Sequence, residues 1–235
     1  MGLELESRVL RAYQRMAADL RRVFGDRFVA LVAGQAGAAA AFAREIRSDD
    51  LDAMGALAHT WHQDGVATPL LMTPDEFTRS LDTFPAEYQS LIDHHVVIDG
   101  VSPLTGAQIG VDDLRRACEA QARGHLIHLR QGWIDGSGHD HGLAHLIEQS
   151  AMPLRRVLTN LARLSGDTPD GDAMLASFAE RQAGLPASLI TAILALDRGS
   201  PASRATGGRA LVPRLGEYLA ASERLWAYID AWRAK

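Results

Sequence analysis

Apolar residues near the start of the chain recur every three or four positions, the spacing of one face of a helix. They are Val9, Tyr13, Met16, Leu20 and Val23. We expect this helix to stop near Gly25. Short apolar runs at 28–33 and 68–72 each predict a buried strand, and 95–99 predicts a last strand that Gly100 ends. The alanines of the stretch 38–44 favour a helix.

Polar residues between these runs indicate where helices begin. Ser48 can cap a helix whose shared face carries Leu51, Met54, Leu57 and Trp61. Thr73-Pro74-Asp75-Glu76 combines a capping threonine, a proline for the first turn and a glutamate three residues on, which predicts a capping box. Phe84-Pro85 breaks that helix before a second short one. Helices and strands alternate up to this point, which is typical of an α/β layer.

Beyond Gly110 the pattern is helical only. We expect helices over residues 111–133, 142–164, 172–183, 187–196 and 211–232, with Pro153 bending the second. Glycine, serine and proline make 198–209 a predicted loop. These helices suit an antiparallel bundle. The chain therefore divides into an α/β domain over 1–105 and a helical bundle domain over 106–235, with the boundary near 102–110.

Several segments carry a resemblance to a known family. They are Pro69-Leu70-Leu71-Met72-Thr73-Pro74, Arg79-Ser80-Leu81-Asp82-Thr83-Phe84-Pro85-Ala86-Glu87, His94-His95-Val96-Val97, Gly100 to Leu104, Leu114-Arg115-Arg116-Ala117-Cys118-Glu119, Arg123-Gly124 and Leu129-Arg130-Gln131-Gly132. Together they resemble bacterial nucleotidyltransferase-fold proteins with a helical C-terminal domain. The resemblance implies an α+β or α/β fold, in which a small mixed sheet with flanking helices precedes an antiparallel helical bundle that forms one wall of a cleft. It also implies that 38–44 is the second strand, against the helical preference of its alanines, so this stretch stays open.

The family's catalytic loop is missing. In active relatives the first strand ends in Gly-Ser, and an Asp-x-Asp pair soon afterwards holds the metal ions. Here Gly34-Gln35-Ala36-Gly37 keeps glycines but offers no hydroxyl and no early carboxylate. Nucleotidyl transfer needs carboxylates that hold Mg²⁺ against a triphosphate. The chain is therefore expected to be a degenerate, catalytically inactive member that needs no cofactor.

Two alternatives remain open. A nucleotidyltransferase with a rearranged site would hold Mg²⁺ through Asp49, Asp50 or Asp52, although acids in the first turn of a helix more often stabilise its positive end. A metal-binding helical protein would use His141, His145 and Glu148, which share a helix face with a spacing that suits Zn²⁺ or Ni²⁺. Three ligands on one helix rarely suffice, so we expect no metal there.

The helix over 111–133 supplies the candidate cleft. Arg116, Glu119, Arg123 and Arg130 fall on the side opposite its apolar face. They either line a cleft that meets an anionic ligand or form a solvated face of Arg–Glu pairs. We expect Glu119 to pair with Arg116 or Arg123. Cys118, on the apolar side, is expected in the core.

Composition and charge limit the classes of function that the chain can have. The net charge of −5 gives no bulk attraction to nucleic acid, and 47% hydrophobic residues can build a core. The chain has one cysteine, its N-terminus lacks the apolar core of a signal peptide, and no apolar run is long enough to span a membrane. We therefore expect a cytoplasmic protein that is not bound to the membrane. The expected partner is an anionic small molecule, a protein or a second copy of this chain. His94-His95 is expected at a helix end before the last strand, and no serine or cysteine is placed to form a catalytic triad with it.

Overall fold

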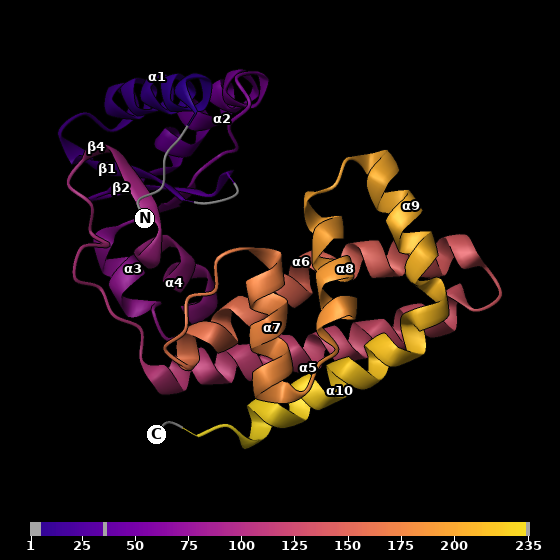
Figure 1. Ribbon diagram of the computed structural model, residues 1–235. Helices are drawn as coiled ribbons and strands as arrows, with labels where there is room; N and C mark the ends of the chain where they lie inside the picture. Colours follow the sequence, from indigo (N-terminus) through magenta and orange to yellow (C-terminus); the bar gives the residue numbers. More distant parts are fainter. Residues whose placement is uncertain (1–5, 35–36, 234–235) are drawn as a thin grey trace. The chain divides into compact units, whose positions relative to one another are not determined.

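The chain folds into two compact units, Met1–Gly110 and Val111–Lys235. The division after Gly110 lies at the end of the region in which the sequence places the boundary. The computed structural model describes residues 6–34 and 37–233. Figure 1 shows strands only in the first unit, so the protein is mixed α+β with a small sheet and a helical second unit.

The first unit contains a mixed sheet of four strands. These are β1 (Phe28–Gly34), β2 (Ala39–Ala43), β3 (Leu70–Met72) and β4 (His95–Gly100), in the order β3-β2-β1-β4. β1 pairs antiparallel with β2 and β4, while β2 pairs parallel with β3. The open stretch 38–44 is thus a strand. All five residues of β2 are buried, and burial against other elements overrides the helical propensity of alanine.

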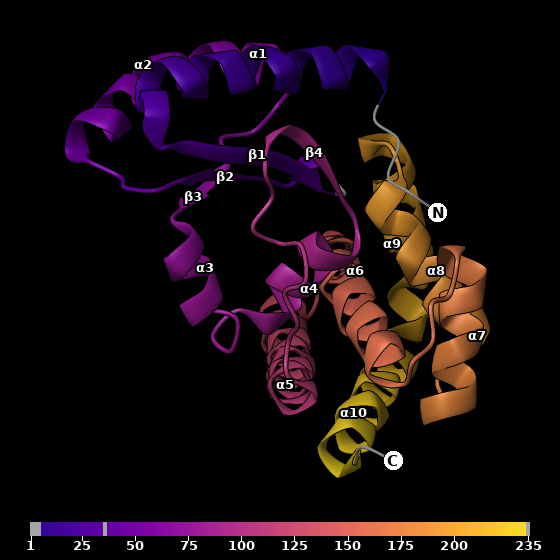
Figure 2. The ribbon, with the colours of Figure 1, turned by 90° about the vertical axis from the view of Figure 1, so that its left-hand side faces the viewer.

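Helices cover both faces of this sheet (Figure 2). α1 (Ser7–Phe24) and α2 (Ser48–Gln63) pack on one face, and α3 (Pro74–Arg79) and α4 (Pro85–Asp93) on the other. Side chains of a strand alternate between faces. Leu31 accordingly joins the core under α1 and α2, whereas the neighbouring Val32 joins the core with Phe77 of α3.

Local chemistry explains where these elements begin and end. The capping box is confirmed, since Thr73 Oγ1 accepts from Glu76 N at 3.1 Å and Thr73 N donates to Glu76 Oε2 at 2.7 Å. Gly100 ends β4 with φ of 83°, and a Cβ there would lie 2.0 Å from the Val29 carbonyl oxygen, so only glycine fits. Ser48 is not the cap of α2, because the cap position belongs to Arg47. The prediction that Leu51 lies on the apolar face of α2 is wrong, since its side chain is exposed.

The second unit is built from α5 (Val111–Gly136), α6 (Asp140–Leu164), α7 (Gly171–Ala183), α8 (Ala187–Arg198), α9 (Pro201–Leu211) and α10 (Leu215–Ala231). Buried side chains from all six form one hydrophobic core. α6 carries Pro153 in its interior. From α6, Arg155 donates to Asp172 Oδ1, Asp197 Oδ2 and the Leu194 carbonyl oxygen, each at 2.7 Å, and so links α6 to α7 and α8.

The predicted loop over 198–209 is wrong, because most of it forms α9. Ser200 caps this helix by accepting from Ser203 N at 3.2 Å, and proline at the first position fits it. The two glycines allow close packing instead of a turn. A Cβ at Gly208 would lie 2.8 Å from the Ala144 carbonyl oxygen of α6, and one at Gly207 would lie 2.6 Å from Leu196 Cδ2 of α8.

Candidate functional site

The end of β1 is where the resemblance places a phosphate-binding turn. β1 pairs antiparallel with the next strand, β2, and Gly34 N donates to the Ala38 carbonyl oxygen at 2.7 Å. Gln35 and Ala36 of the predicted Gly34–Gly37 motif lie outside the described residues. Phosphate sites of this kind use the free amides of a helix N-terminus. The Gly34 amide is not free for such a role, because it already donates to Ala38.

Asp50 is fully engaged by neighbouring donors. Its Oδ2 accepts from Arg27 Nη1 at 2.6 Å and from Arg47 N at 2.8 Å, while its Oδ1 accepts from Arg27 Nη2 at 2.8 Å. The Arg27 guanidinium holds the pKa of this carboxyl down at about 2, helped by the Arg47 amide and opposed by burial. A metal ion would have to displace a bidentate arginine to reach it.

The other candidate carboxylates do not join Asp50. Asp49 and Asp52 are exposed on α2, and Asp49 shares the first turn of that helix with Asp50. β3, next to β2, reads Leu70-Leu71-Met72 and supplies no carboxylate. This geometry favours the role of acids at a helix start, where they stabilise the positive end of the dipole.

The four candidate cleft residues on α5 have partners inside the second unit. Arg116 donates to Asp113, Arg130 Nη2 lies 2.7 Å from Glu223 Oε1, and the Arg123 guanidinium lies 5.7 Å from the centroid of the Trp226 ring. The expected pairing of Glu119 is wrong. Glu119 instead accepts from Arg115 Nη1 at 3.0 Å, because Arg115 is also one helical turn away and the two side chains are only about a quarter exposed.

The three weak metal candidates lie on the first half of α6. His141 and His145 are exposed, while Glu148 is half-buried against α9, with its Oε1 2.9 Å from where a Cβ of Gly208 would be. Within residues 6–34 and 37–233, no group of three or more His, Cys, Asp or Glu side chains is placed to hold a metal ion.

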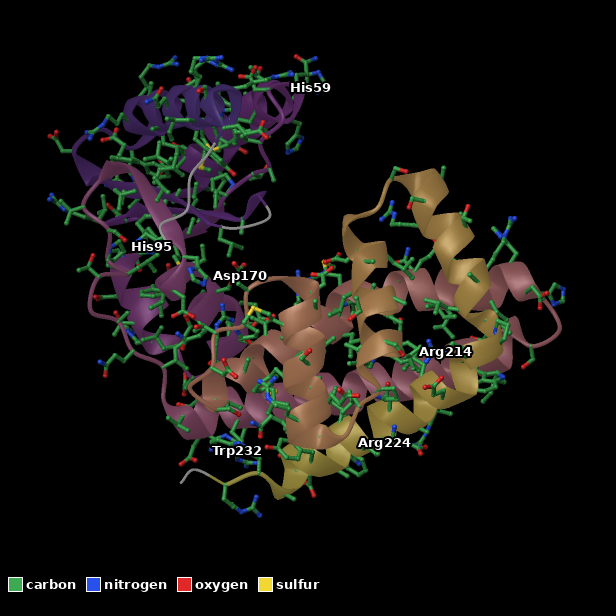
Figure 3. The ribbon with its side chains drawn as sticks, viewed as in Figure 1. His59, His95, Asp170, Arg214, Arg224 and Trp232 are labelled. Atoms are coloured by element: carbon green, nitrogen blue, oxygen red, sulfur yellow. The ribbon has the colours of Figure 1, made fainter. Side chains whose placement is uncertain are left out.

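A serine–histidine contact in the first unit was missed by the sequence reasoning. His95, labelled where β4 begins in Figure 3, has Nδ1 2.8 Å from the Leu91 carbonyl oxygen and Nε2 3.4 Å from Ser102 Oγ. The left-handed turn at Gly100 brings Ser102 back to His95. Ser102 is buried, however, and its Oγ also accepts from Leu104 N at 3.2 Å. The contact therefore secures the turn and offers no accessible nucleophile.

A buried polar network crosses the core of the second unit. Tyr218 of α10 contacts His125 Nε2 of α5 at 2.9 Å and donates to Ser150 Oγ of α6 at 3.0 Å, and Ser150 donates to the Ile147 carbonyl oxygen. Because the tyrosine and serine protons are both used, His125 Nε2 must donate to Tyr218. Burial, with a smaller contribution from His128, lowers the pKa of His125 to about 4, so the ring is neutral.

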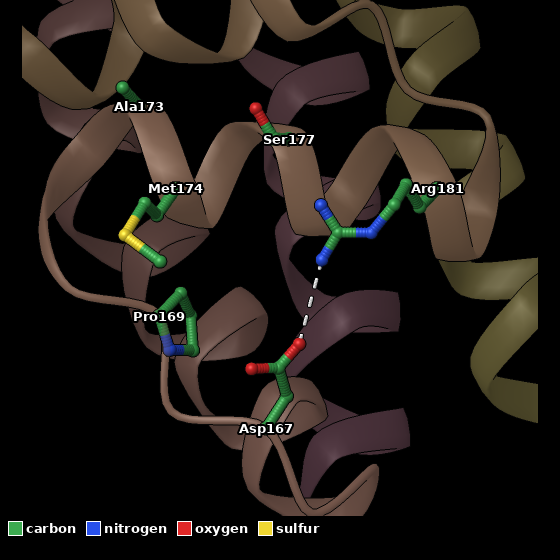
Figure 4. Close-up of a pocket in the computed structure, with 6 residues that line it drawn as sticks. All are labelled: Asp167, Pro169, Ala173, Met174, Ser177 and Arg181. Carbon is green, nitrogen blue, oxygen red and sulfur yellow. Dashed lines mark ion pairs between the residues drawn. The ribbon is translucent and has the colours of Figure 1, made fainter.

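A small open hollow lies beside α7 (Figure 4). Its volume is about 180 Å³, and its lining includes Pro169, Met174 and Ser177, with Asp167 and Arg181 joined across it at 3.6 Å. Ligand pockets usually measure about 300–1,000 Å³. This hollow is too small to serve as a site, and its one cation is already paired.

Comparison with known proteins adds no relative. No family model, no curated protein and no solved structure matches this chain. Among the described residues, no helix combines the length and the apolar character needed to cross a membrane.

Proposed function

We propose that this chain is a degenerate nucleotidyltransferase-like protein without catalytic activity, retained for binding or self-association. The observation that carries the proposal is the state of Asp50. Three hydrogen bonds from Arg27 and Arg47 occupy both of its oxygens. Two-metal phosphoryl and nucleotidyl transfer needs carboxylates that are free to bridge the ions. Asp50 instead holds Arg27, the residue before β1, against the start of α2.

The arrangement of the first unit supports the ancestry in this proposal. The resemblance implies a small mixed sheet with flanking helices, and the sheet of the first unit is mixed and covered by helices on both faces. The matched segments fall on β3, α3, α4, β4 and α5 and on the connections next to them. In this proposal, the helices after Gly110 correspond to the antiparallel bundle of the family.

The direct test is a transfer assay. The chain is incubated with labelled nucleoside triphosphates, Mg²⁺ or Mn²⁺, and protein, RNA and small-molecule acceptors, and no labelled product is expected. Arg27→Met, which releases Asp50 from its partner, should also give none. Metal-dependent transfer by the natural chain that Asp49→Asn, Asp50→Asn or Asp52→Asn abolishes would show a working metal site and overturn the proposal.

A further inference from the structure

One side of α5 carries a regular alternation of arginine and apolar residues. The α5 stripe consists of six side chains spaced four and three residues apart: Arg116, Ala120, Arg123, Ile127, Arg130 and Ile134. All six are exposed, and Ile134 is 75% exposed. The core side of the same helix, with Leu114, Cys118 and Leu129, is buried. The spacing is that of a coiled-coil seam, which normally faces another helix.

The charge of the stripe is largely offset within the second unit. Arg116 is paired with Asp113 and Arg130 with Glu223, while Arg123 lies over Trp226. The guanidinium groups are therefore held at the sides, which leaves their aliphatic stems available for packing. A strongly acidic partner is not needed to neutralise this surface.

We propose that the α5 stripe pairs with the same stripe of a second copy of this chain, with the two helices antiparallel. One register places Arg116 opposite the second copy's Ile134, Arg123 opposite its Ile127, and Ala120 opposite its Arg130. Each arginine stem then packs on an isoleucine or alanine, and no two arginines face each other. The same contacts repeat on both sides of a two-fold axis, as a closed dimer requires.

The order of residues in the stripe favours a second copy over other partners. Read backwards, the alternation places an apolar residue opposite each arginine, so the stripe is complementary to itself. A parallel pair would instead place each arginine beside its own copy, which is unfavourable for like charges. From Arg116 to Ile134 the seam runs for about 27 Å, at about 1.5 Å per residue. This dimer names the partner for the proposed role in binding or self-association, and the inference rests on that proposed function.

Sedimentation of the full chain over a wide concentration range tests the dimer. We expect a reversible shift from monomer to dimer. Ile127→Arg and Ile134→Arg should each weaken association at least tenfold, because they place an arginine opposite Arg123 and Arg116 of the second copy. Met174→Arg is the matched control, because Met174 is exposed on α7, away from the stripe. A natural chain that stays monomeric at hundreds of micromolar, or isoleucine variants that dimerise as well as the natural chain, would overturn the proposal.

Disulfide trapping tests the direction of the helices. Ala120→Cys/Arg130→Cys should give a covalent dimer in mild oxidant, since these positions face each other in the antiparallel register. Ala120→Cys alone should not, because its two copies lie about 15 Å apart in that register. The native Cys118 is buried and will not compete. Rapid linkage of Ala120→Cys alone would show a parallel pair and contradict the proposal. Neither readout depends on the transfer assay, so the two proposals fail separately.

Discussion

Arg27, the residue before β1, forms a bidentate ion pair with Asp50 in the first turn of α2. The carboxylate is almost fully buried, with 7% of its side chain exposed, and the Arg47 amide completes its hydrogen bonding. A carboxyl group that the sequence offers as a metal ligand is thus a structural anchor of the α/β unit.

We expect Asp50→Asn to lower the free energy of unfolding by about 1.5–3 kcal/mol, the range for hydrogen bonds to charged groups. The amide keeps the size of the carboxylate but cannot accept the full set of three donors. Asp52→Asn, at an exposed position of the same helix, should change stability by less than about 0.5 kcal/mol. Urea unfolding of the three proteins measures both values. Equal stability of Asp50→Asn and the natural chain would remove the anchor role.

His125 should make stability depend on pH. Its pKa of about 4 in the folded state lies below the ordinary value of 6.5, so between these values the unfolded chain binds more protons than the folded one. Stability should therefore be complete above about pH 6.5 and fall by about 3 kcal/mol as the pH drops to about 4. Protonation of Asp50 adds a further loss below about pH 4.

Substitution isolates the contribution of His125 to the pH dependence of stability. His125→Gln keeps an N–H donor for Tyr218 and removes the titration, so unfolding measured from pH 7 to pH 4 should lose most of its slope. His145→Gln on α6, where the histidine is exposed, is the matched control and should keep the slope. A natural chain with equal stability at pH 7 and pH 4.5 would show that His125 is not held neutral by burial.

Glu119→Ala should cost only about 0.2–0.5 kcal/mol, the value of a pair one helical turn apart. Its partner Arg115 precedes it by four residues, which is the less favourable order with respect to the helix dipole. Denaturant unfolding of Glu119→Ala beside Arg115→Ala measures the pair. A loss of several kcal/mol in either variant would indicate a desolvated cluster and revive a cleft role for this surface.

Zn²⁺ should leave the thermal midpoint unchanged. A tight site would raise stability by mass action, but His141 and His145 are exposed and the described residues place no third ligand with them. Stoichiometric Zn²⁺ is compared with a sample in chelator. A clear rise that His141→Ala removes would restore the metal-binding interpretation.

Helix ends were predictable from the sequence where they depend on residues that lie close together in the chain. The capping box at Thr73 and Glu76 depends on residues three apart, and both of its hydrogen bonds are present. The alanines of β2 did not predict a strand. The conformation of this segment depends on pairing with β1 and β3 and on burial between helices. Local propensity carries no information about such distant partners.

The candidate site shows the same limit. That Asp50 belongs to the first turn of a helix is visible in the sequence, but its partner Arg27 is 23 positions away and reaches it only through the fold. Tyr218 and His125 are 93 positions apart. Nothing in the spacing of such residues marks them as neighbours, whereas the repeat of the α5 stripe lies within a single helix and can be read directly.

Two glycines in the same kind of helix should respond to alanine in opposite ways. Gly124 lies within α5 with no atom within 4 Å of a Cβ, so Gly124→Ala should stabilise the chain by about 0.5–1 kcal/mol. Gly208 lies in α9, where the Cβ would meet the backbone oxygen of Ala144 at 2.8 Å. A backbone atom cannot rotate away, so Gly208→Ala should destabilise by about 1–3 kcal/mol despite the better helix propensity of alanine. Urea unfolding measures both. A stabilising Gly208→Ala would mean that α9 does not pack closely on α6, and that the glycines at this position mark a loop as the sequence pattern suggests.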